Sequence, residues 1–377
     1  MQTDSMIRVQ NLECSDGKLW RRIGIDAPNQ LNALNLNIIN ALQDALIEAE
    51  DDENIIGVWL EGMGDKGFCA GGDVRALYTS LKDKSSTPED VTAGLKQFFR
   101  AEYSLDAYIY EFPKPIVVWA DGIVMGGGVG LMMGASHRVV TETSTLAMPE
   151  ISIGLFPDCG ATWFLNRVDP KLSRFLGMTG CRLKASDAII AKWADHIVFN
   201  DQKDAVLAEI LKTKWVIDPD GDTSEQEDQL TALLNRHNAT KATRGVASAL
   251  PSEVNQCADW IGEVFSAPSL EELFARLEGS KTNSNFADEA KNNLLKGCPT
   301  SAIIAFEQVR RFRKITLRQA FKMENELAVW MANRPDFAEG IRSTLIDRDR
   351  HPKWNPAGFT SKLKADVAAY LQTISPF

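Results

Sequence analysis

The chain has 377 residues, enough for roughly two or three domains of about 150 residues each. Apolar residues make up 44% of it and charged residues 24%, as in ordinary globular proteins, and a formal net charge of −10 argues against a general nucleic-acid binder. The sequence contains no run of about 18 apolar residues, so no membrane span is expected. No targeting segment is visible at the start, so a cytoplasmic protein is expected.

The six cysteines show no CxxC spacing. They therefore predict reduced thiols in a cytosol-like compartment, not a disulfide framework or a zinc site. The four histidines are scattered along the chain, which favours structural or surface roles over metal binding. We expect no metal site.

The first 200 residues alternate between strand and helix patterns, which indicates an α/β arrangement. The expected strands are residues 7–9, 20–25, 55–60, 116–120 and 139–141. In one predicted helix Ile38, Leu42 and Leu46 lie four residues apart and give an apolar face, with Ile39 and Ile47 beside them. Residues 73–112 are expected to be mainly helical around a polar insert.

After about residue 200 the pattern becomes mainly helical. Helices are expected at 229–238, 251–265, 270–278, 285–295, 300–313 and 316–333. Ser269 and Glu272 form a capping-box pattern at the start of one of them. We therefore predict a core over residues 1–200, and a helical region over 201–377 that completes the site or mediates assembly.

A glycine run, Gly126-Gly127-Gly128-Val129-Gly130, follows the strand at 116–120 and precedes a helix-like stretch. This layout leaves backbone N–H groups unpaired beside a helix N-terminus, where a phosphate, a carboxylate or a developing oxyanion can bind. A tight turn between closely packed backbones is the alternative. The dinucleotide-binding fingerprint does not match, because Leu131 stands where its third glycine belongs.

A second small-residue loop, Cys69-Ala70-Gly71-Gly72-Asp73, lies at another strand-to-helix junction. Two such loops, each after a strand of one sheet, can aim two N–H donors at one carbonyl oxygen. Removing one donor from such an oxyanion hole typically costs on the order of 10²–10³ in rate. Two unrelated tight turns remain the alternative.

Two carboxylates, Glu150 and Asp158, lie in an apolar stretch punctuated by glycine and proline. Burial would raise the pKa of a carboxyl group there and favour general acid or base catalysis. The structural alternative is that each caps a helix, with Asp158 as the N-cap of a helix near Gly160. The basic run at 310–314 predicts a solvated helix end, with a phosphate-facing role as the alternative.

Taken together, these motifs resemble the crotonase (enoyl-CoA hydratase/isomerase) superfamily. The loop at 29–35 fits the family's N-terminal loop, and the stretches 148–158 and 336–349 resemble its acyl-CoA hydrolases most closely. The resemblance implies a crotonase-like α/β spiral of ββα repeats with a mainly helical C-terminal region. It also implies an acyl-CoA substrate, in which coenzyme A is part of the substrate and no cofactor is needed.

The resemblance also assigns residues. The two oxyanion-hole N–H groups fall on Gly72 and Gly127, and the hydrolase carboxylates fall on Glu150 and Asp158. Glu102 corresponds to a further substrate-contacting glutamate. The backbone at Ala70 is expected near the adenine of coenzyme A.

Gly130 bears on the reaction, because crotonase-type hydratases usually carry the first of two glutamates there. Its absence, and the gain of Asp158, favour hydrolysis of a short β-hydroxyacyl-CoA thioester, with 3-hydroxyisobutyryl-CoA of valine breakdown as the first choice. Trp163, in the stretch after Asp158, is expected to shape the acyl pocket, so the identity of the acyl group stays open. An enoyl-CoA hydratase or isomerase and a non-catalytic acyl-CoA-binding protein are the alternatives. The sequence gives no oligomeric state, although a homo-oligomer is compatible with it.

Overall fold

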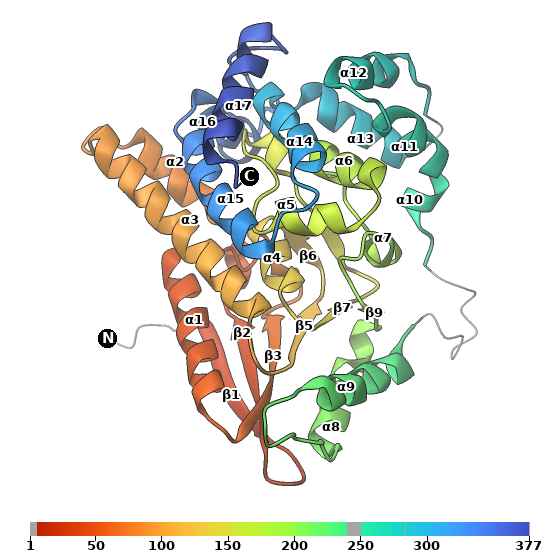
Figure 1. Ribbon diagram of the computed structural model, residues 1–377. Coiled ribbons are helices and arrows are strands. Elements are labelled where there is room, and N and C mark those ends of the chain that lie inside the picture. Colours follow the sequence, from red (N-terminus) through yellow and green to blue (C-terminus); the bar gives the residue numbers. More distant parts are fainter. Residues whose placement is uncertain (1–5, 240–249, 283, 377) are drawn as a thin grey trace. The chain divides into compact units, whose positions relative to one another are not determined.

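The computed structural model describes residues 6–239, 250–282 and 284–376 (Figure 1). It divides into two compact units, each assembled from segments that are separated along the chain. Unit 1 comprises Met1–Gly72, Ser104–Leu146 and Leu183–Ser252, and unit 2 comprises Asp73–Tyr103, Ala147–Arg182 and Glu253–Phe377. The predicted boundary at residue 200, between a core and a helical region, was based on the change from alternating strand and helix patterns to helix patterns, and it stays a prediction.

Unit 1 is built on a six-stranded sheet in the order β1-β2-β3-β5-β7-β9 and a small sheet in the order β4-β6-β8. In the larger sheet β1 is antiparallel to β2, and the other neighbouring strands are parallel. The strands are β1 Ile7–Glu13, β2 Leu19–Ile25, β3 Ile55–Gly62, β4 Gly67–Cys69, β5 Ile116–Ala120, β6 Ile123–Met125, β7 His137–Val140, β8 Thr145–Ala147 and β9 His196–Ile197.

The central strands β3 and β5 are buried along almost their whole length. Both are apolar and rich in β-branched residues, as expected for parallel strands covered on both faces. Trp59 and Trp119 stack with their ring centroids 5.3 Å apart, and Trp20 contacts Trp215 at 5.5 Å. These aromatic pairs form part of a buried apolar cluster.

The helices of unit 1 are α1 Leu36–Asp51, α4 Gly127–Met133, α7 Ala185–Ile190, α8 Lys203–Lys212 and α9 Ser224–His237. In α1, Asn35 caps the N-terminus by accepting the Ile38 N–H, and the predicted apolar face is buried. Ile47 was expected beside that face, but it is 41% exposed. It lies one position beyond Leu46, which rotates its side chain about 100° away from the buried stripe.

Unit 2 is helical. Its helices are α2 Val74–Lys82, α5 Ala161–Phe164, α6 Pro170–Thr179, α10 Glu253–Gln256, α11 Ala258–Phe265, α12 Leu270–Gly279, α13 Asn285–Lys296, α14 Pro299–Arg311, α15 Leu317–Ala332, α16 Pro335–Ile341 and α17 Ser361–Ile374. The long helix α3, Pro88–Tyr110, begins in unit 2 and ends in unit 1. Phe175 on α6 contacts Trp260, Phe265 and Phe286 in the aromatic part of the core.

Most predicted elements are confirmed, including the helical character after residue 200. The strands β4, β6, β8 and β9 were not predicted, because they have only two or three residues each and are too short to show a periodicity. The helix expected at 251–265 is interrupted at Cys257. Ser269 caps α12 as predicted, but the Glu272 carboxylate pairs with Arg276.

All six cysteines are free and buried, which agrees with the predicted reduced thiols. Within the described residues, no helix combines the length and apolar character needed to cross a bilayer.

Candidate functional site

The two loops that carry the predicted oxyanion donors, Gly72 and Gly127, run side by side in unit 1. They follow β4 and β6, which pair in parallel, so both loops leave the same edge of the small sheet. A Cβ atom on Gly71 would lie 2.7 Å from the Met125 carbonyl oxygen and 3.1 Å from the Gly127 nitrogen. The expectation that two strand-end loops come together is confirmed, while the oxyanion role itself stays a prediction.

Helix α4 starts at the glycine run. Gly127 is its first residue, so the Gly127 N–H has no acceptor within the helix and points out of the first turn. Gly126 precedes it at φ 53°, in a region that disfavours a side chain. A Cβ atom on Gly128 would lie 2.2 Å from the Cys69 carbonyl oxygen. The glycines therefore permit both the turn and the close approach of α4 to β4.

The N-terminal loop at 29–35 holds the second glycine loop in place. The Leu34 N–H donates to the Gly71 carbonyl at 2.8 Å, and the Ala70 N–H donates to the Leu31 carbonyl at 3.0 Å. Asn32 is 1% exposed and donates its side-chain amide to two backbone carbonyls. The backbone at Ala70, predicted near the CoA adenine, is thus fixed from outside its own loop.

The three predicted carboxylates, Glu102, Glu150 and Asp158, lie in unit 2 and are all buried, with exposed fractions of 3%, 3% and 4%. Glu102 is on α3, Glu150 begins a 3₁₀ turn, and Asp158 precedes α5. Burial and the negative charge of Asp158 raise the pKa of both glutamates well above its usual range. Carboxyl groups whose pKa is raised by burial and by a neighbouring charge are typical of sites for acid–base catalysis.

Tyr103 is the direct partner of Asp158. Its buried hydroxyl donates a hydrogen bond of 2.5 Å to Asp158 Oδ2. Burial raises the pKa of Asp158 to about 6, although the Tyr103 bond stabilises the carboxylate and opposes that rise. Glu150 Oε2 is buried and has no hydrogen-bond partner among the described residues, which leaves an acceptor for a bound molecule.

The capping alternative for Asp158 is wrong. Helix α5 begins after Gly160 without any cap from the Asp158 side chain, which accepts the Tyr103 hydroxyl instead. The buried N–H groups of Gly160 and Thr162 at this helix start donate to Glu324. Glu150, for its part, is the first residue of a 3₁₀ turn that has no side-chain cap.

The two hydrolase-like stretches, 148–158 and 336–349, meet in unit 2. A Cβ atom on Gly154 would lie 2.6 Å from the Asp336 carbonyl oxygen, and one on Gly340 would lie 2.5 Å from Ile153 Cα. The backbone between the two carboxylates therefore packs directly on helix α16.

Glu102, Asp158 and Cys159 each bring one ligand atom to within 4.8 Å of the other two. Carboxylate and thiolate groups at that spacing are able to share one cation. The same closeness lets the Asp158 charge add to burial in raising the pKa of Glu102.

Three residues that support Asp158 were not predicted from the sequence. Tyr103 gives no local signal beyond its position next to Glu102. Glu324 lies on the buried stripe of α15, so a carboxylate at a core position was a usable signal. Gln308 is likewise buried on α14 and carries no motif.

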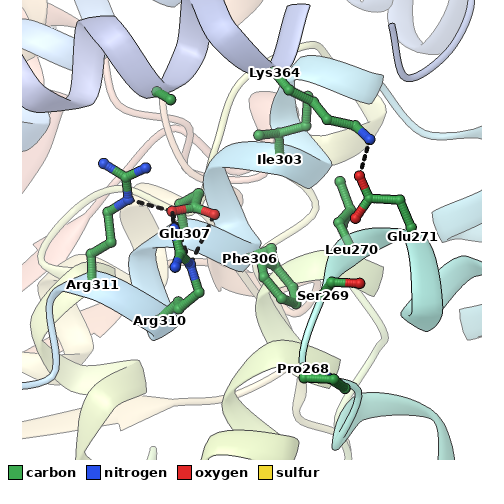
Figure 2. Close-up of a pocket in the computed structure, with 11 residues that line it drawn as sticks. Pro268, Ser269, Leu270, Glu271, Ile303, Phe306, Glu307, Arg310, Arg311 and Lys364 are labelled. Atoms are coloured by element: carbon green, nitrogen blue, oxygen red, sulfur yellow. Dashed lines mark hydrogen bonds and ion pairs between the residues drawn. The ribbon is translucent and has the colours of Figure 1, made fainter. Parts of the chain in front are cut away.

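The predicted basic run borders a pocket of about 280 Å³ between α12, α14 and α17 (Figure 2). Arg310 and Arg311 both pair with Glu307, and Lys364 pairs with Glu271. Because the lining cations are matched by carboxylates, this geometry favours the solvated helix end over a phosphate-facing role.

The comparisons with known proteins identify the family of the chain. Residues 20–371 match the family model described as enoyl-CoA hydratase/isomerase. Curated relatives include the mitochondrial 3-hydroxyisobutyryl-CoA hydrolases of Rattus norvegicus, 35% identical, and Homo sapiens, 34% identical. Each alignment covers 93% of this chain and 86% of the relative.

Solved structures extend the comparison to the fold. A carnitinyl-CoA dehydratase from Mycobacterium thermoresistibile matches with a TM-score of 0.79 and 30% identity, over 98% of this chain and 97% of that one. An enoyl-CoA hydratase from Rhodobacter sphaeroides matches with a TM-score of 0.78 and 29% identity, over 97% and 98%. The predicted crotonase-like α/β fold is confirmed, and the chain belongs to the enoyl-CoA hydratase/isomerase family.

Proposed function

We propose that the protein hydrolyses a short β-hydroxyacyl-CoA thioester, and that 3-hydroxyisobutyryl-CoA is its substrate, giving 3-hydroxyisobutyrate and coenzyme A. The observation that carries the proposal is the buried cluster of Glu102, Glu150 and Asp158 with Tyr103. The names of the curated relatives support the same substrate.

In this proposal the N–H groups of Gly72 and Gly127 bind the thioester carbonyl oxygen and stabilise the negative charge that develops on it. The side-by-side loops after β4 and β6 support the pairing of these donors. The backbone at Ala70 binds the adenine of coenzyme A. Each of these assignments rests on the family resemblance and on the geometry within unit 1.

Glu150 starts the reaction in one of two ways. As a general base it takes a proton from water, which attacks the carbonyl carbon. As a nucleophile it forms a mixed anhydride that water then opens. The raised pKa of Glu150, caused by burial and by Asp158, makes its ionised form a stronger base than an exposed carboxylate. Single turnover in H₂¹⁸O separates the routes, because only the anhydride route is able to place ¹⁸O in Glu150.

Asp158 orients the 3-hydroxyl group or delivers a proton to the departing thiolate as the carbon–sulfur bond breaks. Its pKa of about 6 leaves a protonated fraction near neutral pH. Glu102 contacts the substrate beside it. The reaction needs no metal or redox cofactor, because carboxyl groups and backbone donors supply each step.

The finer predictions on location and assembly also stay proposals. We place the protein in the cytoplasm, where six reduced thiols are compatible with the redox state. The named relatives are mitochondrial, so fractionation with compartment markers is the direct test. A homo-oligomer is the proposed assembly, and light scattering coupled to gel filtration measures it.

The test supplies 3-hydroxyisobutyryl-CoA and follows free thiol in the presence of EDTA. Wild-type protein releases thiol, and Glu150→Gln lowers kcat by about 10²-fold or more, since it loses both basic and nucleophilic capacity. Glu142→Gln, which changes a carboxylate outside the proposed site, serves as the control. Near wild-type turnover by Glu150→Gln contradicts the mechanism.

Two other functions predict different results when other acyl-CoA thioesters are supplied. An enoyl-CoA hydratase removes the absorbance of crotonyl-CoA, and Gly130 in place of a glutamate argues against it. A non-catalytic binding protein binds acyl-CoA but releases no thiol from any member of an acyl-CoA panel.

A further inference from the structure

The loop that carries Asp158 is held on both sides by two buried side chains from distant helices. On α14, Gln308 is 1% exposed. Its side-chain amide donates to the Pro157 carbonyl at 2.9 Å and to the Thr162 hydroxyl at 2.7 Å. Gln308 therefore connects the two ends of the loop, namely the residue immediately before Asp158 and a residue four positions after it.

Glu324 on α15 holds the other backbone groups. Its Oε2 accepts the Gly160 N–H and its Oε1 accepts the Thr162 N–H, both at 2.7 Å. Glu324 is fully buried, and these are N–H groups that the start of α5 leaves without partners in the helix. A carboxyl group has two oxygens that each accept a hydrogen bond, whether or not the group is ionised, so it satisfies both donors at once.

The loop needs such support because its backbone is unfavourable by itself. Cys159 has φ 55° and Gly160 has φ 86°, so two successive residues occupy the left-handed region. A non-glycine residue persists there only where its surroundings fix the conformation. The bonds from Gln308 and Glu324 bracket this segment, and Tyr103 holds the Asp158 carboxylate itself.

We propose that Glu324 and Gln308 are positioning residues that set the direction of the Asp158 carboxylate, and thereby the rate of thioester cleavage. This rests on the proposed function. It gives the C-terminal helices a part in the reaction, although neither residue contacts the substrate. A misplacement of about 1 Å in such a site can cost about 100-fold in rate.

The first test is Glu324→Gln, which keeps the size of the side chain but replaces one acceptor oxygen with a donor. One of the two N–H groups then faces another donor. We expect kcat to fall about 10- to 100-fold with KM changed by less than about threefold. Glu326→Gln, an exposed change on the same helix, keeps wild-type kinetics. Gln308→Met is the second variant and should show the same kcat-selective loss.

A double-mutant cycle separates positioning from general structural damage. If Glu324 acts through Asp158, adding Glu324→Gln to Asp158→Asn lowers the residual kcat by less than about threefold. Fully additive losses overturn the proposal. The acyl-CoA used is the one that wild-type protein cleaves fastest, so an incorrect substrate assignment does not affect the result.

A substrate-free measurement keeps the inference separate from the proposed function. Amide hydrogen exchange should lose protection at Gly160 and Thr162 in Glu324→Gln, while Glu326→Gln keeps it. Unchanged exchange at both amides overturns the positioning role even where no thioester is cleaved. Changed exchange, without thiol release by wild-type protein, contradicts only the proposed function.

Discussion

Asp158 and its neighbours show how burial and hydrogen bonding act in opposite directions on one carboxyl group. Burial raises the pKa of Asp158, and the hydrogen bond from Tyr103 lowers it, leaving a value of about 6. Burial, and after it the charge of Asp158, raises the pKa of Glu102 and Glu150. A change at one member of the cluster is therefore expected to alter the protonation of the others.

Tyr103→Phe tests this balance. Without the hydroxyl, the ionised form of Asp158 loses its stabilising donor, so its pKa rises above about 6 and more of it is protonated at pH 7. We expect kcat to fall about tenfold. The limb of the pH–rate profile that reports Asp158 should move to higher pH.

The matched control is Tyr108→Phe, which removes a hydroxyl bonded to Glu50 further along α3. It should leave the pH–rate profile unchanged. A Tyr103→Phe profile that coincides with wild type would show that this hydroxyl does not tune Asp158.

At the level of elements, two stretches almost 180 residues apart in sequence meet through glycines. Gly340 lets α16 press on the backbone at Ile153, between Glu150 and Asp158. Backbone atoms cannot move aside as the end of a flexible side chain can. The fit of α16 thus bears directly on the segment that joins the two carboxylates.

Gly340→Ala should therefore damage the site from a distance. Its methyl group would lie 2.5 Å from Ile153 Cα, so the segment must shift, although alanine favours the helix by about 1 kcal/mol. We expect a lower melting temperature and at least about a tenfold fall in kcat.

Gly94→Ala on α3 is the control, because its methyl group would meet nothing within 4 Å. It should raise stability by roughly 0.5–1 kcal/mol without affecting turnover. Equal behaviour of the two variants in calorimetry and in the thiol assay would contradict the packing argument.

The sequence predicted the elements whose patterns are local. The spacing of Ile38, Leu42 and Leu46 gave α1, and the apolar run at 116–120 gave β5. It also placed Gly72 and Gly127 on neighbouring loops. It did not reveal Tyr103 or Gln308, because a residue that bonds a partner about 50 or 150 positions away leaves no periodic or motif signal nearby.

Over the whole molecule, the two units carry buried titratable groups of opposite kinds. In unit 1, burial lowers the pKa of His137 to about 4. It also lowers the pKa of His196, whose ring stacks beside that of His137. In unit 2, burial raises the pKa of Asp158 to about 6 and that of Glu324 to about 8. Each unit therefore has its own dependence of stability on pH.

The signs follow from proton binding. A histidine with a lowered pKa binds fewer protons folded than unfolded, so unit 1 loses stability as pH falls below about 6.5. A carboxyl group with a raised pKa binds more protons when folded, so unit 2 loses stability as pH rises from about 4.5 towards 8.

Amide hydrogen exchange, corrected for the intrinsic effect of pH, measures both units in one sample. From about pH 5 to about pH 8, the opening free energy should rise for core amides of unit 1 and fall for those of unit 2. A parallel change in both units would show that these buried groups do not dominate. Glu324→Gln should remove part of the loss in unit 2.

The six buried cysteines have a practical consequence. Thiol reagents that label exposed cysteines should find the folded chain nearly inert, since burial also raises the pKa of Cys14 and Cys298 to about 11. One engineered surface cysteine on each unit would then accept a fluorophore without deleting any native thiol. Such a doubly labelled protein would allow the distance between the two labels to be measured by energy transfer, with and without an acyl-CoA.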